Sequence, residues 1–475
     1  MSIHPLEEIL HPQSIAVVGA SDSGRGSGFL APLIQYGYRG KIYPVNPKYS
    51  EIMGIQAYAR IRDIPGPVDY VISTIPASQV LGMLEDCSQK NVKVVHLFTA
   101  RFSETGRKDA AELEHKILER ARNADIRLIG PNCLGLYYPR ERIAFHDDFP
   151  EEPGEAGLAS QSGQAVGEII RMASMRGMRF SKAISYGNAI DFNECDYLEY
   201  FAQDPETKII MMYIEGVKDG RRFLKILRNV TATKPVIIVK GGRGESGTRA
   251  TASHTASLAG TMEVWETVVH QAGALSAGNL EELVDLSTAF YFLPPVLGYR
   301  VGVAGGSGGS SVLAADECEE AGLNVIPLPS EIREELKSKG SLIWDWIGNP
   351  ADMSIRIDRA FDTGDMLEIM AKNDNFDLLI AFMRGPHHRG DQKISADAVL
   401  ERHRIGKLNN KPLLIVMPDF GPGIEDDEEY AWMRELMIEV REKLVSTNIP
   451  VYPSIGRAAR AASKLIDYYQ RRRSR

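Results

Sequence analysis

The sequence predicts an α/β fold made of three consecutive doubly wound domains. Short β-branched runs alternate with helical patterns along almost the whole chain of 475 residues, and this alternation favours parallel sheets covered by helices. In each of three successive blocks a glycine-rich turn follows a strand. A chain of this length also exceeds one ordinary core, so two or three domains are expected.

The first block, residues 1–146, contains five runs with the composition of buried strands. Helical patterns around 77–90 and 105–124 separate some of these runs. The block closes near the acidic, proline-containing stretch at 147–157, which has the composition of a linker. The five strand runs are "SIAVVGA", "KIYPVN", "DYVIST", "VKVVHLF" and "IRLIG".

The second and third blocks, residues 147–296 and 297–475, repeat this pattern and are predicted to be separate domains. The second has expected strands at "GLASQ", "KAISYG", "KIIMMYIEG" and "PVIIVKGG", and it ends at "FLPPVLGYR". The third opens with "RVGVAGGSGGSSVLAADECEEAGL" and continues through expected strands at "LNVIPL", "DLLIAFM", "KPLLIVMPD" and "IPVYPS".

Composition excludes several classes of protein. Hydrophobic residues make up 44% of the chain and charged residues 25%, as in ordinary soluble proteins. The net charge of −8 argues against a nucleic-acid partner, and we interpret the closing "RRRSR" as a solvated tail. Four separated cysteines form neither a disulfide framework nor a zinc site, and no apolar run reaches the length of a membrane span. We therefore expect a cytoplasmic protein with no metal site and no membrane contact.

A glycine-rich loop, "VVGASDSGRGSGF", follows the first strand. Gly19 ends the strand, and Gly26 and Gly28 allow backbone N–H groups to approach an anion at the start of a helix. The spacing is not the G-x-G-x-x-G of dinucleotide-binding loops, and Lys48 follows the second strand where such proteins have a carboxylate for the ribose. This favours a ligand with extra phosphate. A loop that serves only as a tight turn is the alternative.

Two further helix starts have the same construction. Each lies between a strand and a helix, where free N–H groups and the helix dipole favour an anion. The first is at Ser162 and Gly163 in "ASQSGQAVGEII", and the second is in "AGGSGGSSVLAADE" at Gly306, Ser307, Gly308 and Gly309. As a pair, they predict one phosphate held from two sides.

One histidine, His254, lies in a run of small residues. The stretch "RGESGTRATASHTASLAG" leaves little bulk around this imidazole, directly before the helical pattern "LAGTMEVWETVVHQAG". Small neighbours give the imidazole access as a nucleophile, and the nearby Arg243 and Arg249 offset phosphate charge. A structural histidine is the alternative.

A nucleophilic imidazole needs an acceptor for the N–H of its other nitrogen. Glu215 in "MMYIEGVKDG" ends an otherwise apolar strand, where an unpaired carboxylate would be costly, and it is the predicted partner of His254. The alternative for Glu215 is a carboxylate that accepts hydrogen bonds from backbone amides at a helix start.

Together these motifs resemble the ADP-forming (NDP-forming) acyl-CoA synthetases and, more distantly, succinyl-CoA synthetase. The resemblance covers nearly the whole chain and implies an N-terminal Rossmann-like CoA-binding domain followed by two flavodoxin-like domains. It runs, in order, through "HPQSIAVVGASDSGRGSGF", "GPNCLG", "SQSGQAVGE", "SYGNAIDFNECDYLEYFAQDPETKII", "YIEGVKDGRRF", "SHTASLAG", "VAGGSGGSS" and "GNPADM".

The resemblance implies a reversible reaction in which an acid, CoA and ATP give acyl-CoA, ADP and phosphate through an acyl phosphate. In that family a histidine carries the phosphoryl group, and His254 matches it, with Glu215 as the supporting glutamate. A small loop would let phosphorylated His254 swing between sites. The two glycine-rich helix starts match the family's phosphate-holding helices. The implied CoA-binding positions are Gly19, Ser21, Ser23, Gly26, Gly28, Lys48 and Asn132.

The sequence departs from the family pattern at two positions. Ala256 replaces a usual glycine after the His-Thr pair, which is a mild change. Arg101 in "LFTARFSETG" stands where a glycine is usual, near the expected CoA thiol. Its guanidinium either folds back to a surface carboxylate such as Glu104 or grips a second anionic group of the acyl substrate and so sets specificity.

No part of the chain resembles an ATP-grasp module, so the resemblance implies the α subunit of a split enzyme. The partner would be an ATP-grasp β subunit that binds ATP or ADP with Mg²⁺, in an expected heterotetramer, and the other substrate a small carboxylic acid. One alternative is a non-catalytic acyl-CoA-sensing module, which needs neither His254 nor Glu215. Another is an NAD-dependent oxidoreductase, which the loop spacing disfavours.

Overall fold

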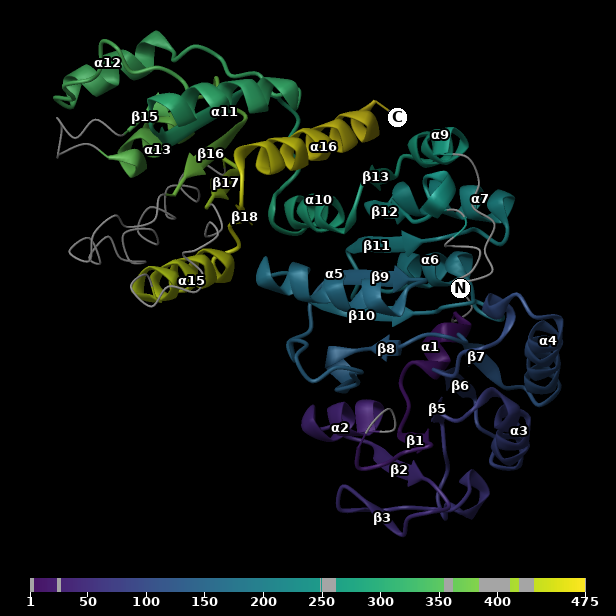
Figure 1. The fold of residues 1–475 in the computed structure, drawn as a ribbon. Helices are drawn as coiled ribbons and strands as arrows, with labels where there is room; N and C mark the ends of the chain where they lie inside the picture. Colours follow the sequence, from purple (N-terminus) through teal and green to yellow (C-terminus); the bar gives the residue numbers. More distant parts are fainter. Residues whose placement is uncertain are drawn as a thin grey trace. The chain divides into compact units, whose positions relative to one another are not determined.

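The computed structural model describes residues 4–23, 27–247, 249, 262–353, 362–383, 411–417 and 431–474. It divides into two compact units, Met1–Leu283 (unit 1) and Val284–Arg475 (unit 2), and each is described by itself (Figure 1). Unit 1 contains two large sheets and unit 2 contains one. The sheets are mostly parallel and carry helices, which confirms the predicted α/β class.

The first sheet of unit 1 has the strand order β2-β1-β5-β6-β7, and all its strand pairs are parallel. Its strands are continuous apolar runs because parallel sheets are covered on both faces. The chain adds its strands outward from β1 on one side and from β5 on the other, so the switch point of this doubly wound fold lies between β1 and β5. The strands are β1 (Ser14–Val18), β2 (Lys41–Val45), β5 (Tyr70–Ser73), β6 (Val94–Leu97) and β7 (Arg127–Ile129).

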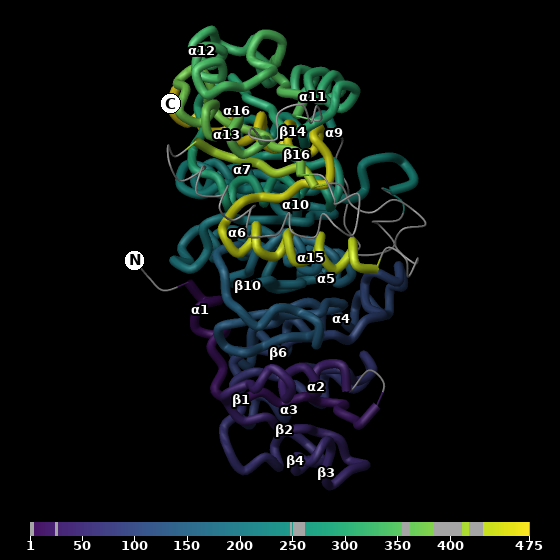
Figure 2. The backbone as a smooth tube through the Cα atoms, turned by 90° about the vertical axis from the view of Figure 1, so that its left-hand side faces the viewer, coloured from purple at the N-terminus to yellow at the C-terminus, as the bar shows by residue number. Residues whose placement is uncertain are grey.

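Four helices and a short hairpin accompany this sheet. Helix α3 packs against α4, and α4 contacts β7, while α1 lies between the two large sheets of unit 1 in both views (Figures 1 and 2). The elements are α1 (Pro5–Ile9), α2 (Ser27–Gln35), α3 (Val80–Gln89), α4 (Lys108–Asn123), and the strands β3 (Glu51–Ile52) and β4 (Ile55–Gln56).

The second sheet has the order β13-β12-β11-β9-β10-β8, with its switch point between β9 and β11. All its strand pairs are parallel except β10 with β8, which is antiparallel. Because β8 spans residues 135–137, the second sheet includes residues before the predicted boundary at 146; both domain boundaries stay predictions. The strands are β8 (Gly135–Tyr137), β9 (Ala156–Ser160), β10 (Phe180–Ser185), β11 (Ile209–Ile214), β12 (Val236–Lys240) and β13 (Leu275–Ala277).

Helices of the second sheet begin at strong N-terminal caps. Asn193 and Asp196 form a capping box at the start of α6, and the Asp219 carboxylate accepts from Arg222 N at the start of α7. Such caps each contribute about 1 kcal/mol. Helix α5 contacts β9 and β10, α6 contacts β9 and β11, and α7 contacts β12. The helices are α5 (Gly163–Met175), α6 (Glu194–Gln203), α7 (Gly220–Thr231) and α9 (Met262–Ala272).

Unit 2 repeats the arrangement with a parallel sheet of order β15-β14-β16-β17-β18. Its core packs Met366, Met370 and Phe376 against the apolar faces of β16 and β17. The strands are β14 (Val301–Gly306), β15 (Ala351–Asp352), β16 (Leu378–Phe382), β17 (Leu413–Val416) and β18 (Val451–Tyr452). The helices are α11 (Gly308–Glu320), α12 (Ser330–Ser338), α13 (Thr363–Lys372), α15 (Ala431–Ser446) and α16 (Ile455–Arg473), preceded by α10 (Leu280–Phe292) at the junction of the units.

Two sequence expectations need correction. The expected strand at 323–328 is not formed: only an isolated bridge joins Arg300 and Asn324 there, and beyond it the Asn349 side chain takes the place of a strand, accepting from Val303 N and donating to the carbonyls of Val301 and Ile326. The arginines of the expected tail, Arg471–Arg473, form the last turn of α16, where cations are favourable because of the helix dipole. Over the described ranges, we find no helix with the length and apolar character that crossing a membrane requires.

Candidate active site

The candidate catalytic residues that the structure describes lie at the switch point of the second sheet. Gln161 and Ser162 follow β9, and Glu215 follows β11, the neighbouring parallel strand. The carboxyl ends of parallel strands lie at the same edge of a sheet, and the switch point is where such folds form a crevice. The strand order therefore brings Gln161 and Glu215 together although they are 54 residues apart in the sequence.

Ser162 is the N-terminal cap of α5. Its Oγ accepts a hydrogen bond from Ala165 N at 3.3 Å, and its backbone N–H donates to Ser160 Oγ at 3.2 Å. Gly163, the first residue of the helix, is partly exposed. The helix start has the geometry of an anion site at this edge, as predicted for Ser162 and Gly163; phosphate binding itself stays a prediction.

Glu215 is buried, with 4% of its surface exposed, and its backbone is held from two sides. Gln161 Oε1 accepts from the backbone N–H groups of Glu215 and Gly216, and Lys240 Nζ donates to the Glu215 carbonyl at 2.6 Å. Glu215 is not the cap of the next helix, because α7 begins only at Gly220 and its cap is Asp219.

The side chains of Tyr213 and Glu215 meet above Gly241. A Cβ added at Gly241 would lie 2.7 Å from Tyr213 Oη and 3.2 Å from Glu215 Cγ. Burial and the Glu215 carboxylate raise the pKa of Tyr213 to about 12, so its hydroxyl keeps its proton at neutral pH.

A cavity of about 430 Å³ opens beside this pair. Its wall includes the start of α5, the turn after β12 and the turn after β13. Arg243 contributes an exposed cation, whose Nη1 lies 3.7 Å from a Cβ built at Gly278. His254 lies outside the described residues, as do residues 250–261 as a whole. The lining includes Ser162, Tyr213, Lys240, Gly241 and Arg243.

The predicted CoA-binding positions of the first domain follow the carboxyl ends of its strands. Gly19 ends β1 with φ +90°, and a Cβ there would lie 2.5 Å from Thr74 Oγ1, so the close approach of β1 and β5 requires glycine. Asn46, after β2, donates to the Ala20 carbonyl and accepts from Lys48 N, which brings Lys48 to the same edge.

Ser21, Ser23 and Gly28 belong to the turn after β1 and the start of α2. The Ser21 hydroxyl donates to the Ser23 carbonyl at 2.6 Å. Among the described residues, apart from its chain neighbours and its own helix backbone, no heavy atom lies within 4 Å of a Cβ built at Gly28, so these residues leave space beside the first turn of α2. Gly26 lies outside the described residues.

Arg101 and Asn132 follow β6 and β7 and share the left-handed conformation. Their φ angles are +80° and +58°, and Asn132 N donates to Thr99 O. Arg101 is exposed. The Glu104 carboxylate accepts from the backbone N–H groups of Arg101 and Phe102 and from Asn188 Nδ2 at 2.7 Å. Glu104 thus fixes the Arg101 backbone, and the conformation of Arg101 is one that favours glycine.

Unit 2 has the second predicted helix start, at the carboxyl end of β14. Ser307 caps α11, and its backbone N–H donates to Ser310 Oγ at 2.6 Å. Gly308 and Gly309 are exposed in the first turn, and in the part of unit 2 that the structure describes no heavy atom outside the helix's own backbone lies within 4 Å of a Cβ built at Gly309. Gly306, the last residue of β14, is buried. The phosphate held jointly with Ser162 stays a prediction.

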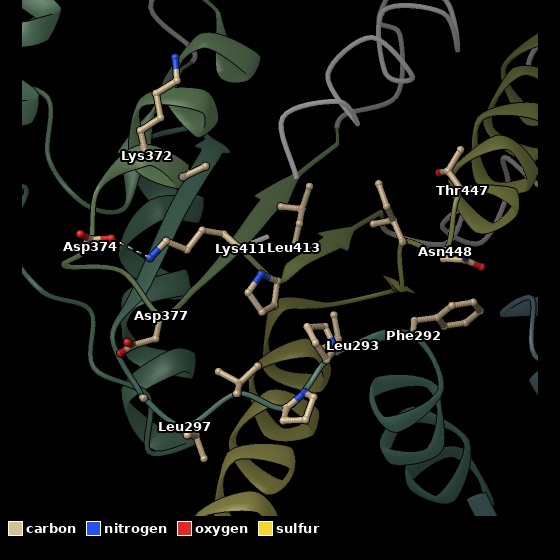
Figure 3. Close-up of a pocket in the computed structure, with 17 residues that line it drawn as sticks. Phe292, Leu293, Leu297, Lys372, Asp374, Asp377, Lys411, Leu413, Thr447 and Asn448 are labelled. Atoms are coloured by element: carbon tan, nitrogen blue, oxygen red, sulfur yellow. Dashed lines mark ion pairs between the residues drawn. The ribbon is translucent and has the colours of Figure 1, made fainter. Parts of the chain in front are cut away.

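A larger cavity, about 930 Å³, lies in unit 2 around the segment 292–298 (Figure 3). Its lining residues Asp377, Lys411 and Asn448 precede β16, β17 and β18, so it lies at the amino edge of the sheet, opposite the edge where such folds bind ligands. Figure 3 shows Lys411 directed toward Asp374, with Nζ 4.0 Å from Oδ1. The cavity and the start of α11 therefore lie at opposite edges of this sheet.

Sequence reasoning missed three residues around Glu215: Gln161, Tyr213 and Lys240. Tyr213 looked like an ordinary strand residue, and Lys240 like a surface residue at a strand end. One signal was present for Tyr213, because residues two apart on a strand share a face, and Tyr213 precedes Glu215 by two.

Comparison with known families agrees with the two sheets of unit 1. Residues 13–139 match a CoA binding domain, and residues 153–290 match a succinyl-CoA ligase-like flavodoxin domain. In the solved structure of a dinucleotide-forming acetyl-coenzyme A synthetase 1 from Ca. Korarchaeum cryptofilum, in complex with phosphate and ADP, the similarity covers 99% of this chain and 97% of that one, with a TM-score of 0.79 and 29% identity.

The curated relatives of this chain agree with these domain and structure matches. The α subunit of acetate–CoA ligase (ADP-forming) II from Pyrococcus furiosus is 35% identical over 97% of both chains. Acetate–CoA ligase (ADP-forming) from Methanocaldococcus jannaschii is 39% identical over 70% of this chain, which spans about half (47%) of that longer relative. A 4-hydroxybutyrate–CoA ligase (ADP-forming) from Nitrosopumilus maritimus is 32% identical over 73% of this chain and 50% of its own length. The chain therefore belongs to the ADP-forming acyl-CoA synthetase family, and it matches an α subunit of that family over nearly its whole length.

Proposed function

We propose that this chain is the α subunit of a heteromeric acid–CoA ligase that reversibly converts an acid, CoA and ATP into acyl-CoA, ADP and phosphate. The observation that carries the proposal is the 35% identity to an α subunit over 97% of both chains. The alternatives of an acyl-CoA-sensing module and an NAD-dependent oxidoreductase have no relative of comparable similarity behind them among those above.

His254 is the proposed phosphoryl carrier, and Glu215 its supporting carboxylate. A carboxylate that accepts the N–H of one imidazole nitrogen leaves the lone pair of the other nitrogen free to attack phosphorus. Glu215 is suited to this because it is buried and its backbone N–H and C=O are both held by hydrogen bonds. The same carboxylate then stabilises the positive charge that the imidazole gains when it carries the phosphoryl group.

CoA is proposed to bind along the carboxyl edge of the first sheet. The match of residues 13–139 to a CoA binding domain supports this, as do the open space at Gly28 and the exposed Lys48 after β2. Arg101 and Asn132, which follow β6 and β7, are proposed to lie toward the reacting end of CoA. Phosphate is proposed to bind at the helix starts of α5 and α11, where N–H groups are free of helical partners.

ATP and Mg²⁺ are assigned to a partner, an ATP-grasp β subunit, in a cytoplasmic heterotetramer. The lengths of the relatives support a partner: the chain spans 47% of the M. jannaschii ligase but 97% of the P. furiosus chain named subunit α. The names of the relatives also make acetate the first acid to test.

Reconstitution with an ATP-grasp subunit tests the proposal. The complex is expected to form ADP from ATP only when both CoA and an acid such as acetate are present, and this chain alone is expected to form none. By calorimetry the chain alone is expected to bind CoA and not NAD. Tight NAD binding, ATP hydrolysis by this chain alone, or a complex that is inactive with every small acid tried would each count against the assignment.

A further inference from the structure

A turn of the second sheet, residues 186–190, packs against the turn that follows β7 in the first sheet. The backbone N–H of Asn188 donates to the Pro131 carbonyl at 3.0 Å. Gly187 has a φ of +50°, and the carbonyls of Pro131 and Asn132 leave no room for a Cβ there. The turn 186–190 thus lies directly against Asn132, a proposed CoA-binding position.

The Asn188 side chain reaches a second turn of the first sheet, the one after β6. Its Nδ2 donates to Glu104 at 2.7 Å and to Glu114 at 3.1 Å, so two carboxylates share one amide group. Glu104 also accepts from the backbone N–H groups of Arg101 and Phe102. Asn188 is 1% exposed, and its Oδ1 has no hydrogen-bond partner among the described residues. The amide orientation is nevertheless fixed, because a flip would turn Oδ1 toward the two carboxylates.

The same junction borders the start of α5. The backbone N–H of Leu134, in the loop after β7, donates to Ser185 Oγ at 3.1 Å. A Cβ built at Gly163, the first residue of α5, would lie 3.1 Å from Leu134 Cγ. The proposed CoA edge of the first sheet and the proposed phosphate site at α5 therefore meet in the loop that the turn 186–190 packs against.

We infer that Asn188 is a positioning residue for thioester formation, acting through Glu104 on the turn that carries Arg101. The inference rests on the proposed function. In that step the acyl group passes from the phosphate oxygen of the acyl phosphate to the CoA sulfur, and the thiol proton passes to the released phosphate. Asn188 bonds to neither reactant. It holds Glu104, and Glu104 holds the backbone beside which the reacting end of CoA is proposed to lie.

Asn188→Ala tests the inference in the complex reconstituted with an ATP-grasp subunit. It removes the donor that Glu104 and Glu114 share, so the two carboxylates repel each other and the turn after β6 loosens. We expect the single-turnover rate of acetyl-CoA formation from acetyl phosphate and CoA to fall about tenfold or more, the scale of a hydrogen bond to a charged group. CoA affinity by calorimetry should stay near wild type, because the proposed contacts of Lys48 and of the turn after β1 are untouched. Label uptake from γ-labelled ATP, which precedes the CoA step, should be unchanged.

A double-mutant cycle tests whether Asn188 acts through Glu104. Glu104→Ala removes the acceptor from a partly exposed side chain and should slow the same step. If the two residues act as one unit, Asn188→Ala adds little to the defect of Glu104→Ala. Full additivity of the two defects would overturn the inference. Asn188→Asp, which turns a third carboxylate toward the pair, should be slower than Asn188→Ala, and a faster rate would also count against the inference.

Asp191→Asn is the matched control for a general loss of packing between the sheets. Asp191 lies in the same segment and accepts from Arg127 Nε at 2.8 Å, but Arg127 is the first residue of β7, at the end of the strand away from Asn132. Asp191→Asn should therefore keep the wild-type rate. A wild-type rate in Asn188→Ala, or an equal loss in Asp191→Asn, would overturn the inference. A wild-type complex that forms no acetyl-CoA from acetyl phosphate would instead overturn the proposed function.

Discussion

Replacing Arg101 by glycine should stabilise the first domain. Arg101 has a φ of +80°, a left-handed conformation that L-residues avoid because of their Cβ, and its side chain is exposed. Its backbone N–H donates to Glu104, and this hydrogen bond survives the substitution. Glycine therefore removes the Cβ that causes the strain and keeps the contact that fixes the turn.

The expected gain is the difference between two terms. A left-handed residue with a Cβ costs about 1–2 kcal/mol, which glycine avoids. Glycine in turn loses about 0.5–1 kcal/mol because its unfolded chain has more freedom. Arg101→Gly should thus raise the free energy of unfolding by about 0.75 kcal/mol, the midpoint of a difference of about 0 to 1.5 kcal/mol, while Arg101→Ala, which keeps the Cβ, should not.

Urea unfolding of the full chain, followed by circular dichroism, measures this difference. A midpoint that rises for Arg101→Gly and stays level or falls for Arg101→Ala fits the backbone argument. Equal loss of stability in both variants would refute it, since the guanidinium would then contribute more than the strained backbone costs.

The same variant tests the role proposed for the guanidinium in substrate choice. If Arg101 grips a second anionic group of the acid, Arg101→Gly should lower the ratio of kcat/KM for a dianionic acid to that for acetate by about tenfold or more, the scale of a charge-assisted contact of about 1.5–3 kcal/mol. The test uses the reconstituted complex. An unchanged ratio would remove Arg101 from the specificity argument and leave only its backbone effect.

Three further predictions concern buried groups. Burial lowers the pKa of His96 from 6.5 to about 4, so between these pH values the unfolded chain takes up a proton that the folded chain does not. The stability present above pH 6.5 should therefore be lost as the pH falls toward 4, by about 3 kcal/mol at about 1.4 kcal/mol per pH unit. Urea titrations of wild type and of His96→Gln should differ in that pH window. Glu215→Gln should leave the urea midpoint near wild type but slow labelling of His254 by roughly a hundredfold, and unchanged labelling kinetics would make Glu215 structural. Lys182→Met should cost about 3–5 kcal/mol in urea unfolding, because it leaves Asp204 buried without its cation (3.0 Å), and a neutral result would show that packing compensates.

Most strands could be predicted because strands covered on both faces are continuous apolar runs. The residues of β1 and β12 are all buried, and both were expected from their sequence. The strand expected at 323–328 failed, since an apolar run does not reveal that the Asn349 side chain takes up backbone groups of β14 and of Ile326. The antiparallel β8 was missed because its three residues pair with residues of β10 that lie 46 to 50 positions further along the chain (Tyr137 with Ala183, Gly135 with Ser185).

The sequence predicted a residue of the candidate site only where that residue type was unusual for its position in the strand pattern. Glu215 was conspicuous as a carboxylate after an apolar strand, and the structure confirms its burial. The buried lysines were not conspicuous in the sequence, because lysine is usually a surface residue. Lys182 and Lys240 are only 1% and 4% exposed. Their burial follows from their partners, which are Asp204 for Lys182 and, for Lys240, the carbonyl of Glu215 after β11 and that of the neighbouring Gly241.

The central claim, that His254 carries the phosphoryl group, is tested most directly by labelling. The reconstituted complex is incubated with γ-labelled ATP and Mg²⁺, and the labelled site is found by peptide mapping. The account predicts an acid-labile, base-stable label on His254 and no such label in His254→Ala. Uptake of the same label by His254→Ala would contradict it.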